Sequence, residues 1–566
     1  MSELRIGRTN DDEGTVTAGV REALALAHSG NPVEAERRCR ELLVADPRCF
    51  EALALLGLLT QQQGRMEEAD RLLAEAAALR PQAADVLAAR GLVLRKLERY
   101  EEALKVLDAA LEARPRYFEA LFNRGNVLLE LERPEEAAGS FGAALTLRPE
   151  DLDTQNSLAT VLARLGRHTE ALPLQGAVFE ARGDAPAAIG LGNTYQALGH
   201  YERALETFDR ALQLQPNSRE ALINRGNALR ALGRHREALG CYDEVLARDP
   251  GNGAARLNRG LTRLTLGDFE HGWKEYEWRR PSTQGARPET SSIVPTWSGS
   301  EPLQGKRLLL YTEQGFGDAI QFVRYAPLLA EHGANVVVVC PEELVGLFAT
   351  VDGVARALTL DDHLPAADYR ALLMSLPLAL GTRLDTIPGE VPYVSADPDR
   401  VAAWRERLER AGGGRKVGLV WRGNPDNPAA AIRDCPADRL PPLLAVPGCT
   451  FFSLQLDEGA ADVNALTTRG LPIVDLAAEL GDFHETAAAM CALDAVISVD
   501  TAAAHLAGAL GRPGWVLLQS AADWRWLVDR EDSPWYPSLR LIRQPSSGDW
   551  SAVIARVAAE LDSPDG

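Results

Sequence analysis

The sequence predicts an α-solenoid of helical hairpins in its first half and an α/β region of two Rossmann-like domains in its second half. The first prediction rests on small residues that recur at a nearly constant interval up to about residue 260. The second rests on short apolar strands that alternate with helices from Lys306 onward. A third observation is the stretch ISVDTAAAHLAGALG (Ile497–Gly511), in which an apolar strand turns within two residues into a helix of small side chains. Such strand–helix units build parallel sheets.

Three sets of residues in the first half share one spacing. Alanines follow one another at intervals of 34 residues, with a single interval of 33: Ala35, Ala69, Ala103, Ala137, Ala171, Ala204 and Ala238. Glycines keep the same step, with Ala159 in the one gap: Gly57, Gly91, Gly125, Gly192, Gly226 and Gly260. Prolines close successive units: Pro47, Pro81, Pro115, Pro149, Pro216 and Pro250. Small residues let two antiparallel helices approach and proline ends the second helix. The whole pattern resembles the tetratricopeptide repeat.

Asparagines recur at two positions of these repeats, three residues apart, and so fall on one face of a helix. They are Asn123, Asn224 and Asn258 at the first position, and Asn126, Asn193 and Asn227 at the second. Because an amide side chain both donates and accepts hydrogen bonds, such a row is expected to bind the backbone of an extended acceptor peptide. A similar row marks the repeats of the O-linked N-acetylglucosamine transferases. The alternative is that some of these asparagines only bond neighbouring helices.

Composition narrows the class of partner. The chain has 60 basic and 80 acidic residues, a formal net charge of −20. This balance argues against binding to nucleic acid or to an anionic membrane. The first residues, MSELRIGRTNDDEG, are polar rather than a signal peptide, and no apolar run is long enough to span a bilayer. Seven scattered cysteines without a CxxC pair indicate free thiols and a cytoplasmic location.

The expected organisation has six segments. A disordered N-terminus (1–17) precedes the repeats (18–280), and a linker rich in Pro, Ser and Gly follows (281–302). A first Rossmann-like domain (303–396), a connector (397–415) and a second Rossmann-like domain (416–566) complete the chain. The aromatic half-repeat Leu266–Arg279 is expected to cap the array and pack on the domain that follows. The final helix, Trp550–Leu561, is expected to pack across the first α/β domain.

The first α/β domain carries a glycine turn where its first strand leads into a helix. Open α/β sheets bind ligands at that edge. Gly315 and Gly317 are expected to permit positive φ and close approach of a ligand. Asp318 follows at the start of the helix. It is either a general base or an ordinary helix N-cap, and the spacing does not separate these two roles.

The second domain carries the turn Asp500-Thr501 within the stretch quoted above. The amides of Ala502–Ala504 are expected to be unpaired at the start of the helix, where they and the helix dipole attract a diphosphate. His505 lies one turn into this helix and is either close to that ligand or simply packed. The alternative for the turn is that Asp500 only caps its own helix.

Three stretches carry a resemblance to a known family: EQGFGDAIQFVRYAP, VGLVWRGNP and SVDTAAAHLAGALG, with the later DWRWL and SPWYP. In order and spacing they resemble the heptosyltransferase-like family of GT-B glycosyltransferases, over about Leu303–Gln544. Repeats followed by such a domain resemble bacterial protein O-glycosyltransferases, including those that modify flagellin. The resemblance implies an inverting, metal-independent transfer from a nucleotide sugar bound by the second domain. The nucleotide sugar is a co-substrate, and no cofactor is implied.

The resemblance also implies roles for single residues. It makes Asp318 the general base, and Glu313, a few residues earlier, is the reserve. It places the Asp500-Thr501 turn in the donor site, for which Gly315, Gly317, Ala502, Ala503 and His505 are further candidates. The family's phosphate-facing basic residue lies in the second domain's first loop, where this sequence offers Arg422, beside Asn424, and Arg433. The family usually has lysine there, so the sugar (hexosyl, nonulosonyl or heptosyl) and the nucleotide stay open.

The leading hypothesis is an enzyme that transfers a sugar to Ser or Thr of a protein held by the repeats, with flagellin or its chaperone complex as a candidate. The alternatives are an inactive adaptor whose GT-B half binds nucleotide or a partner, and a heptosyltransferase acting on lipopolysaccharide, which leaves the repeats without a task. No metal ligands are predicted. The DxD matches Asp151–Asp153 and Asp397–Asp399 fall in a repeat and in the connector, and Asp361–His363 is expected to be an exposed loop.

Overall fold

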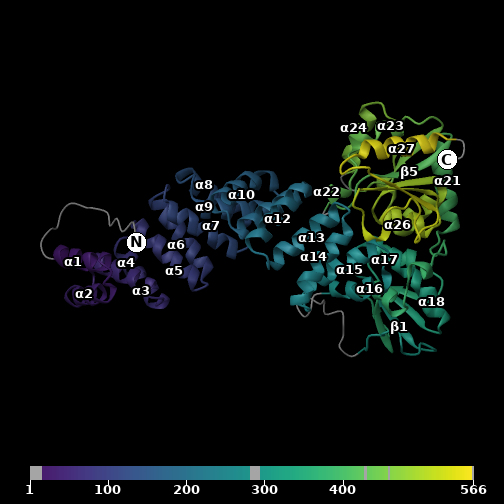
Figure 1. Ribbon diagram of the computed structural model, residues 1–566. Coiled ribbons are helices and arrows are strands. Elements are labelled where there is room, and N and C mark those ends of the chain that lie inside the picture. The colour runs from purple at the N-terminus through teal and green to yellow at the C-terminus, as the bar shows by residue number, and fades with distance from the viewer. Residues whose placement is uncertain (1–15, 281–293, 426–429, 457–458, 564–566) are drawn as a thin grey trace. The chain divides into compact units, whose positions relative to one another are not determined.

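The computed structural model describes residues 16–280, 294–425, 430–456 and 459–563 (Figure 1). It confirms the predicted fold class, because helical repeats lead into an α/β region with parallel sheets. The first helix begins at Val16, so the last two residues of the expected disordered N-terminus are helical. The rest of that segment, and residues 281–293 of the expected linker, lie outside the described residues.

The described part of the chain has sixteen repeat helices, which follow one another along the chain in pairs (Figure 1). They are α1 (Val16–His28), α2 (Pro32–Ala45), α3 (Phe50–Gln62), α4 (Met66–Leu79), α5 (Ala84–Lys96), α6 (Tyr100–Ala113), α7 (Phe118–Glu130), α8 (Pro134–Leu147), α9 (Leu152–Arg164), α10 (His168–Arg182), α11 (Ala185–Ala197), α12 (Tyr201–Leu214), α13 (Arg219–Ala231), α14 (His235–Arg248), α15 (Gly253–Thr265) and α16 (Phe269–Tyr276).

The 34-residue spacing has a direct packing cause. All seven of the predicted alanines are fully buried. Each predicted glycine of the first helix in a pair faces a large side chain of the second helix. A β-carbon added to Gly125 would lie 2.6 Å from the Phe141 ring, and one added to Gly226 would lie 2.6 Å from Tyr242. Since real β-carbons do not approach that closely, only glycine fits there, and the helices of a pair pack at short range.

The chain divides into two compact units, Met1–Asn224 and Arg225–Gly566. The division falls inside α13 rather than at the expected end of the repeats near residue 280. Helices α14, α15 and α16 therefore belong to the same unit as the α/β domains. The two units are described separately below.

The first α/β domain has a four-stranded parallel sheet in the order β3-β2-β1-β4. The strands are β1 (Arg307–Tyr311), β2 (Asn335–Val339), β3 (Val354–Leu358) and β4 (Tyr369–Leu372). The helices are α17 (Phe316–Phe322), α18 (Ala326–Glu331), α19 (Glu342–Phe348) and α20 (Leu376–Ala379). The apolar runs predicted β1 and β2. The edge strand β3 was not predicted, because Ala355 and Arg356 are exposed and break the apolar pattern.

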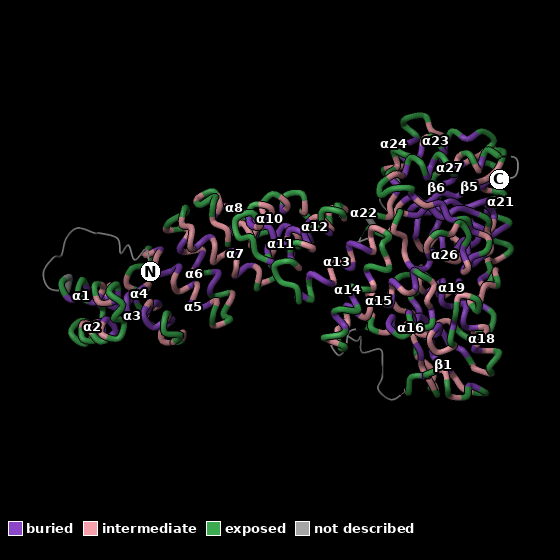
Figure 2. Tube along the Cα trace, in the orientation of Figure 1, coloured by how far each residue is buried: buried purple, intermediate pink, exposed green. Residues whose placement is uncertain are grey.

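The second α/β domain has a six-stranded parallel sheet in the order β10-β9-β8-β5-β6-β7. The strands are β5 (Arg415–Val420), β6 (Cys449–Ser453), β7 (Ile473–Asp475), β8 (Ala495–Val499), β9 (Gly514–Leu518) and β10 (Leu539–Arg543). The helices are α21 (Pro398–Ala411), α22 (Ala430–Arg433), α23 (Pro441–Leu444), α24 (Gly459–Thr468), α25 (Phe483–Ala492), α26 (Ala502–Ala509) and α27 (Trp550–Asp562). All five residues of β8 are buried, and the strands around β5 and β6 form a purple band in Figure 2.

The strand order fixes where a ligand is expected on the second sheet. β5 is its first strand in the chain and β8 its fourth, yet the two are hydrogen-bonded neighbours. The strand order therefore reverses between them, as in the Rossmann fold. Open parallel sheets bind ligands beyond the carboxyl ends of the strands at such a reversal.

One expected boundary and one expected helix packing differ in the structure. Trp297, placed in the linker by composition, is buried, and Thr296 pairs with Arg370 of β4, so the second part of that segment belongs to the first α/β domain. Helix α27 does not pack across the first domain as expected. Its apolar residues, among them Val553 and Val557, lie in a core with β5, β8 and β9 of their own sheet.

The end of the repeats shares a core with the α/β domains, as the aromatic half-repeat predicted. Phe269, Trp273 and Tyr276 of α16 lie in one buried cluster with residues of both sheets' flanking helices. The Trp273 indole N–H donates to the Thr382 carbonyl at 3.0 Å, and its ring centroid lies 5.2 Å from that of Trp524. Helix α16 is thus structurally part of the α/β unit.

We expect Trp273→Ala to lower the free energy of unfolding of the unit beginning at Arg225 by about 3–5 kcal/mol, because it leaves a cavity in this shared core. Trp278→Ala is the matched control, since the Trp278 side chain is 40% exposed, and it should cost less than about 1 kcal/mol. Urea denaturation of both variants, followed by circular dichroism, measures the difference. Equal losses would show that α16 does not belong to that core.

Candidate functional site

The strand reversal of the second sheet collects most of the predicted donor residues. β5 ends at Val420 and leads into the loop that carries Arg422 and Asn424. β8 ends at Val499 and leads into Asp500 and Thr501. Because β5 and β8 are adjacent parallel strands, both loops emerge at the same edge of the sheet.

The start of α26 offers two N–H groups. Thr501, not Asp500, is the N-cap residue, and it makes no side-chain cap, so the alternative in which Asp500 only caps the helix is wrong. The Ala504 N–H donates to the Thr501 carbonyl at 3.1 Å, which removes it from the three expected amides. Within the described residues, the amides of Ala502 and Ala503 have no acceptor. These two carry the positive end of the helix dipole.

Asp500 is a buried carboxyl at this edge, only 8% exposed. Burial raises its pKa to about 6, and the nearby Asp523 carboxylate adds to the rise, while the guanidinium groups of Arg433 and Arg525 act in the opposite direction. A group of this kind changes its protonation within the physiological range.

His505 is a packed side chain rather than an open one. Its Nδ1 lies 2.9 Å from the Tyr536 hydroxyl, and its ring stacks on Trp526 with centroids 5.4 Å apart. Burial and nearby arginines hold the pKa of His505 well below its usual value, so the ring is neutral. Its Nε2 lies 4.0 Å from an Asp500 oxygen, which joins it to the site as a neighbour of that carboxyl.

The glycine turn of the first domain differs from the expectation. Gly315 has a φ of −84°, and Gly317 is not among the described residues with positive φ; the left-handed residue of the turn is Gln314, at φ 62°. Gly317 instead allows α17 to approach α26, because a β-carbon there would lie 2.7 Å from the His505 ring. The positive φ expected for the two glycines is therefore wrong, whereas approach of a ligand to Gly317 stays a prediction.

Asp318 is the N3 residue of a capping box whose N-cap is Gly315, so it caps the helix without being the N-cap itself, and its role as a base stays a prediction. One of its oxygens accepts the Gly315 N–H at 3.0 Å, which is the cap. The other forms an ion pair with Arg525 of the short helix η7 (Trp524–Trp526). Since Arg525 is also near Asp500, the turns of the two domains meet at one guanidinium.

Arg525 and Asp523 are the site residues that sequence reasoning did not single out. The Arg525 side chain is 9% exposed. It binds Asp523 through a 2.7 Å hydrogen bond and Gln321 through another of 2.7 Å. Its guanidinium lies 4.3 Å from the Trp524 ring centre. The only signal was the stretch DWRWL, which the resemblance included without assigning a role to its arginine.

The two arginine candidates for phosphate binding differ in their surroundings. Arg422 donates to Asp462 at 3.1 Å and lies 3.8 Å from Asp434. Arg433 forms no ion pair within the described residues, and its buried Nε has no hydrogen-bond acceptor there. Its effect on the pKa of Asp500 places it near that carboxyl. Arg433 is therefore the better candidate, and Asn424 lies on the exposed part of the Arg422 loop.

The remaining acidic candidates have structural partners. Glu313, the reserve base, forms an ion pair with Arg279. Asp151 caps α9 and Asp397 caps α21. The Asp362 carboxylate accepts the Thr359 N–H in an exposed loop. Across the described ranges, no three His, Cys, Asp or Glu side chains are grouped so that they could hold a metal ion.

Within Met1–Asn224, the asparagine row is only partly occupied by structural contacts. The Asn224 amide donates to the Asn193 side-chain oxygen at 2.8 Å, so these two bond across neighbouring helices. The side chains of Asn123 and Asn126, half-buried on α7, make no hydrogen bond within the described residues. The first pair follows the structural alternative, and the second pair stays available to a peptide.

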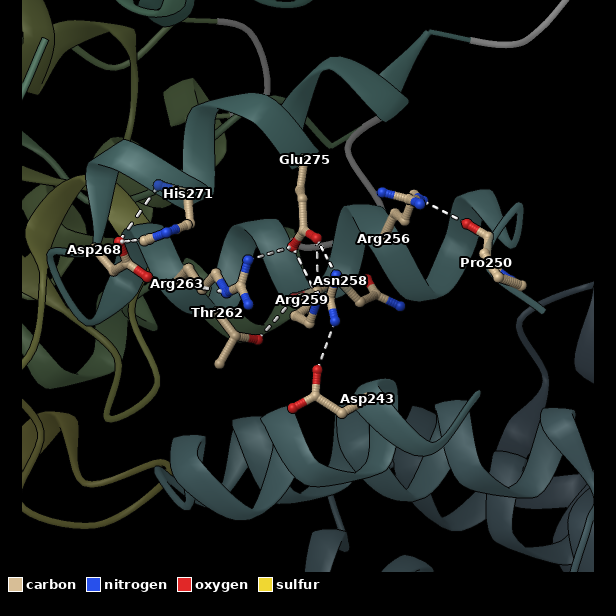
Figure 3. Close-up of polar contacts among 10 residues, drawn as sticks. All are labelled: Asp243, Pro250, Arg256, Asn258, Arg259, Thr262, Arg263, Asp268, His271 and Glu275. Carbon is tan, nitrogen blue, oxygen red and sulfur yellow. Dashed lines mark hydrogen bonds and ion pairs between the residues drawn. The ribbon is translucent and has the colours of Figure 1, made fainter. Parts of the chain in front are cut away.

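The other two asparagines belong to the unit that begins at Arg225. Asn227 accepts the Tyr242 hydroxyl at 2.8 Å and is thus structural. Asn258 lies on α15 next to Arg259, which binds the buried Glu275 and reaches Asp243 (Figure 3). The backbone carbonyl of Asn258 accepts from Thr262, whereas its side-chain amide is not bonded within the described residues. The ion pair between Arg259 and Glu275 joins α15 to α16.

No helix in the described ranges has both the length and the apolar composition that crossing a bilayer requires.

Comparisons with known proteins match the repeats. The tetratricopeptide-repeat family matches residues 61–118 and 88–151, and again 150–217 and 184–251. The predicted repeat type is therefore confirmed for this part of the chain.

A curated relative, protein FlbA of Caulobacter vibrioides strain ATCC 19089, is 32% identical over 323 residues. The match covers 53% of this chain and 53% of that protein, so the chain spans about half the length of the curated relative it matches. Among solved structures, YrrB, titled a TPR protein with an unusual peptide-binding site, is 28% identical with a TM-score of 0.31; 32% of this chain and 95% of that chain are covered. PilF of Pseudomonas aeruginosa is 23% identical with a TM-score of 0.33 over 36% and 94%.

The buried Asp500 predicts a pH dependence. A carboxyl whose folded-state pKa exceeds its unfolded value stabilises the fold fully at low pH, and this contribution is lost as the pH rises through the folded-state value, here about 6. Asp500→Asn keeps the shape of the neutral acid and cannot ionise. We expect equal stabilities near pH 4, and a variant more stable than wild type by about 2–3 kcal/mol at pH 8. Urea denaturation between pH 4 and 8 measures this, and a pH-independent difference would contradict it.

Proposed function

We propose that this chain is a protein O-glycosyltransferase that transfers a sugar from a nucleotide-sugar donor to Ser or Thr of a protein bound by its repeats. The observation that carries the proposal is the edge of the second sheet, where Arg433 has no ion pair and the Ala502 and Ala503 amides have no acceptor among the described residues. At the same edge Arg525, which interacts with Asp500, pairs with the Asp318 carboxylate of the first domain. Cationic and N–H groups at a strand reversal suit a diphosphate, and a nearby carboxylate suits an attacking hydroxyl.

In this mechanism the acceptor hydroxyl attacks the anomeric carbon of the donor sugar. A new carbon–oxygen bond forms as the bond from that carbon to the phosphate breaks, and the hydroxyl proton passes to Asp318. Arg433 and the Ala502 and Ala503 amides neutralise the charge that develops on the departing diphosphate. Attack opposite to the leaving group inverts the anomeric centre.

The repeats supply the acceptor. Tetratricopeptide repeats imply a protein partner, and in the unit beginning at Arg225 the helix that carries Asn258, α15, packs against η7, which carries Arg525. A peptide held along α15 would thus lie close to the chemistry, which raises the effective concentration of its hydroxyl groups. The resemblance of the overall layout makes flagellin, alone or with its chaperone, the first acceptor to test, in the cytoplasm.

One observation favours the second candidate, an adaptor without catalysis. Asp318 already has two partners, because one of its oxygens accepts the Gly315 N–H and the other pairs with Arg525, so both oxygens are engaged before any acceptor binds. The two candidates separate when the protein is incubated with a panel of nucleotide sugars, with and without flagellin. Nucleotide release together with a mass increase of intact flagellin supports the enzyme. Donor binding with no release under any condition supports the adaptor.

The arginine assignment gives a test on the donor side. Arg433→Ala should weaken nucleotide-sugar binding about 10- to 100-fold, or 1.5–3 kcal/mol, if its guanidinium makes a charge-assisted hydrogen bond to phosphate. Arg422→Ala is the matched control, because Arg422 is engaged by Asp462, and it should change the affinity less than about threefold. Titration calorimetry measures both. The reverse order of effects would assign the phosphates to Arg422.

Asp318→Asn tests the base. Asparagine can still accept the Gly315 N–H, and Arg525 keeps Asp523, so folding and donor binding should survive. Turnover should fall about 10²- to 10⁴-fold, the usual range for a lost general base. Asp397→Asn, which alters a helix cap elsewhere, should leave turnover within about twofold. Initial rates of nucleotide release measure both variants, and near-normal turnover of Asp318→Asn would reduce Asp318 to a cap.

A further inference from the structure

We infer that Arg279, at the end of the last repeat, is a positioning residue for the turn Glu313–Asp318, and thereby couples the repeats to the catalytic carboxylate. The inference rests on the proposed function, since it gives that turn its catalytic task. Arg279 lies in the short helix η1 (Glu277–Arg279), directly after α16. Its side chain is 4% exposed, unlike that of its neighbour Arg280.

The Arg279 guanidinium uses its whole hydrogen-bonding capacity. It binds both oxygens of Glu313, one of them at 3.3 Å, in a fork-like pair. It donates to the Ser375 hydroxyl at 2.9 Å and to Glu277 at 2.7 Å, and a fifth bond of 3.3 Å reaches the Tyr276 carbonyl. An arginine has five N–H groups, so none is left over. A lysine in this place could not reproduce the planar fork.

The partners of Arg279 identify its position on the first sheet. Glu313 follows the end of β1, and Ser375 lies in the short helix η3 (Leu373–Ser375) that follows β4. β1 and β4 are adjacent parallel strands at which the order of the first sheet reverses. In such sheets this is where a ligand binds. In this structure the Arg279 side chain, at the end of the last repeat, lies there against Glu313 and Ser375. The end of the repeats is therefore part of this edge of the first domain.

Glu313 transmits this anchoring to the catalytic carboxylate over a short stretch of chain. The next residue, Gln314, has a φ of 62°, a conformation that residues other than glycine rarely adopt and that must be held by its surroundings. Gly315 follows and donates its N–H to Asp318. If the bond from Arg279 to Glu313 is weakened, Gln314 is free to relax, and Gly315 and Asp318 move with it.

A second set of contacts from α16 reaches the other side of Asp318. The rings of Trp273 and Tyr276 pack on Trp524, with centroids 5.2 and 5.8 Å apart. Trp524 precedes Arg525, the ion-pair partner of Asp318, and stacks under its guanidinium. Asp318 is therefore held between a turn and an arginine that both rest on the last repeat helix.

The experiment compares Arg279→Lys with Arg280→Lys in the full chain. Arg280 bonds Glu277 and Ser375, as Arg279 does, but not Glu313, so it is the control for the proposed contact. We expect Arg279→Lys to lower kcat about 10- to 100-fold, because small displacements of a catalytic group are costly, while donor affinity changes less than about twofold. Hydrogen exchange of residues 312–319 should be at least about fivefold faster in Arg279→Lys only.

Glu313→Gln is the second variant, because it weakens the same contact from the other partner and leaves the repeats unchanged. It should show the same slower kcat and faster exchange, and the double variant should be no worse than either single one. This variant decides the question if Arg279→Lys does not fold.

Two outcomes overturn the inference: exchange at 312–319 equal to that of Arg280→Lys, or a loss of donor affinity with kcat unchanged. If wild-type protein releases no nucleotide from any donor, the proposed function fails. Hydrogen exchange then decides the positioning role alone, because faster exchange in Arg279→Lys and Glu313→Gln supports it and unchanged exchange refutes it.

Discussion

The geometry of the candidate site depends on the Arg525 guanidinium. It binds Asp318 of the first α/β domain and Asp523 of the second, donates a hydrogen bond to the Gln321 side-chain oxygen, and lies on the Trp524 ring. A buried charge of this kind is costly unless every N–H has a partner, and removing one partner leaves an uncompensated charge. The two domains are therefore held in the relative arrangement that keeps the arginine satisfied, which brings the Gly315–Asp318 turn to the start of α26.

Burial organises the charges around this arginine. Asp500 and Asp523 are close enough to disfavour joint ionisation. The positive charges of Arg525 and Arg433 act in the opposite direction and lower the pKa of Asp500. A diphosphate placed next to Arg433 would add negative charge near Asp500, and so favour its neutral form. Neutral His505 fits the same pattern, since a further cation beside the two arginines would be unfavourable. Bound ligand and protonation state are thus linked at this edge.

The sequence predicted the parts of the molecule that depend on local spacing. The 34-residue period follows from contacts such as Gly125 on Phe141, which lie 16 residues apart in one hairpin. The strands β1, β2, β5 and β8 are buried on both faces and read as apolar runs. The exposed edge strand β3 lacks such a run and escaped prediction. The sequence also predicted both turns, because a strand followed at once by a helix places the turn between them at the carboxyl edge of a parallel sheet.

Contacts between distant segments could not be predicted in this way. Arg525 lies 207 residues after Asp318, and no spacing rule connects them. The same limit explains why the contact between Gly317 and the His505 ring was not predicted. The sequence favoured Arg422 over Arg433 for the phosphates, and only the position of Asp462, which pairs with Arg422, reverses that order. Side-chain chemistry showed what each residue can do, and tertiary structure decided which partner it has.

The division of the chain inside α13 has a consequence for how such a protein can change over evolution. The last hairpins share a core with the α/β domains and cannot be lost without exposing Trp273 and its neighbours. The hairpins before α13 form a unit of their own, built from interchangeable 34-residue pieces. Duplication or deletion of whole repeats there would lengthen or shorten the array while the unit beginning at Arg225 keeps its core. Under the proposed function, the range of acceptors and the catalytic site would then change independently.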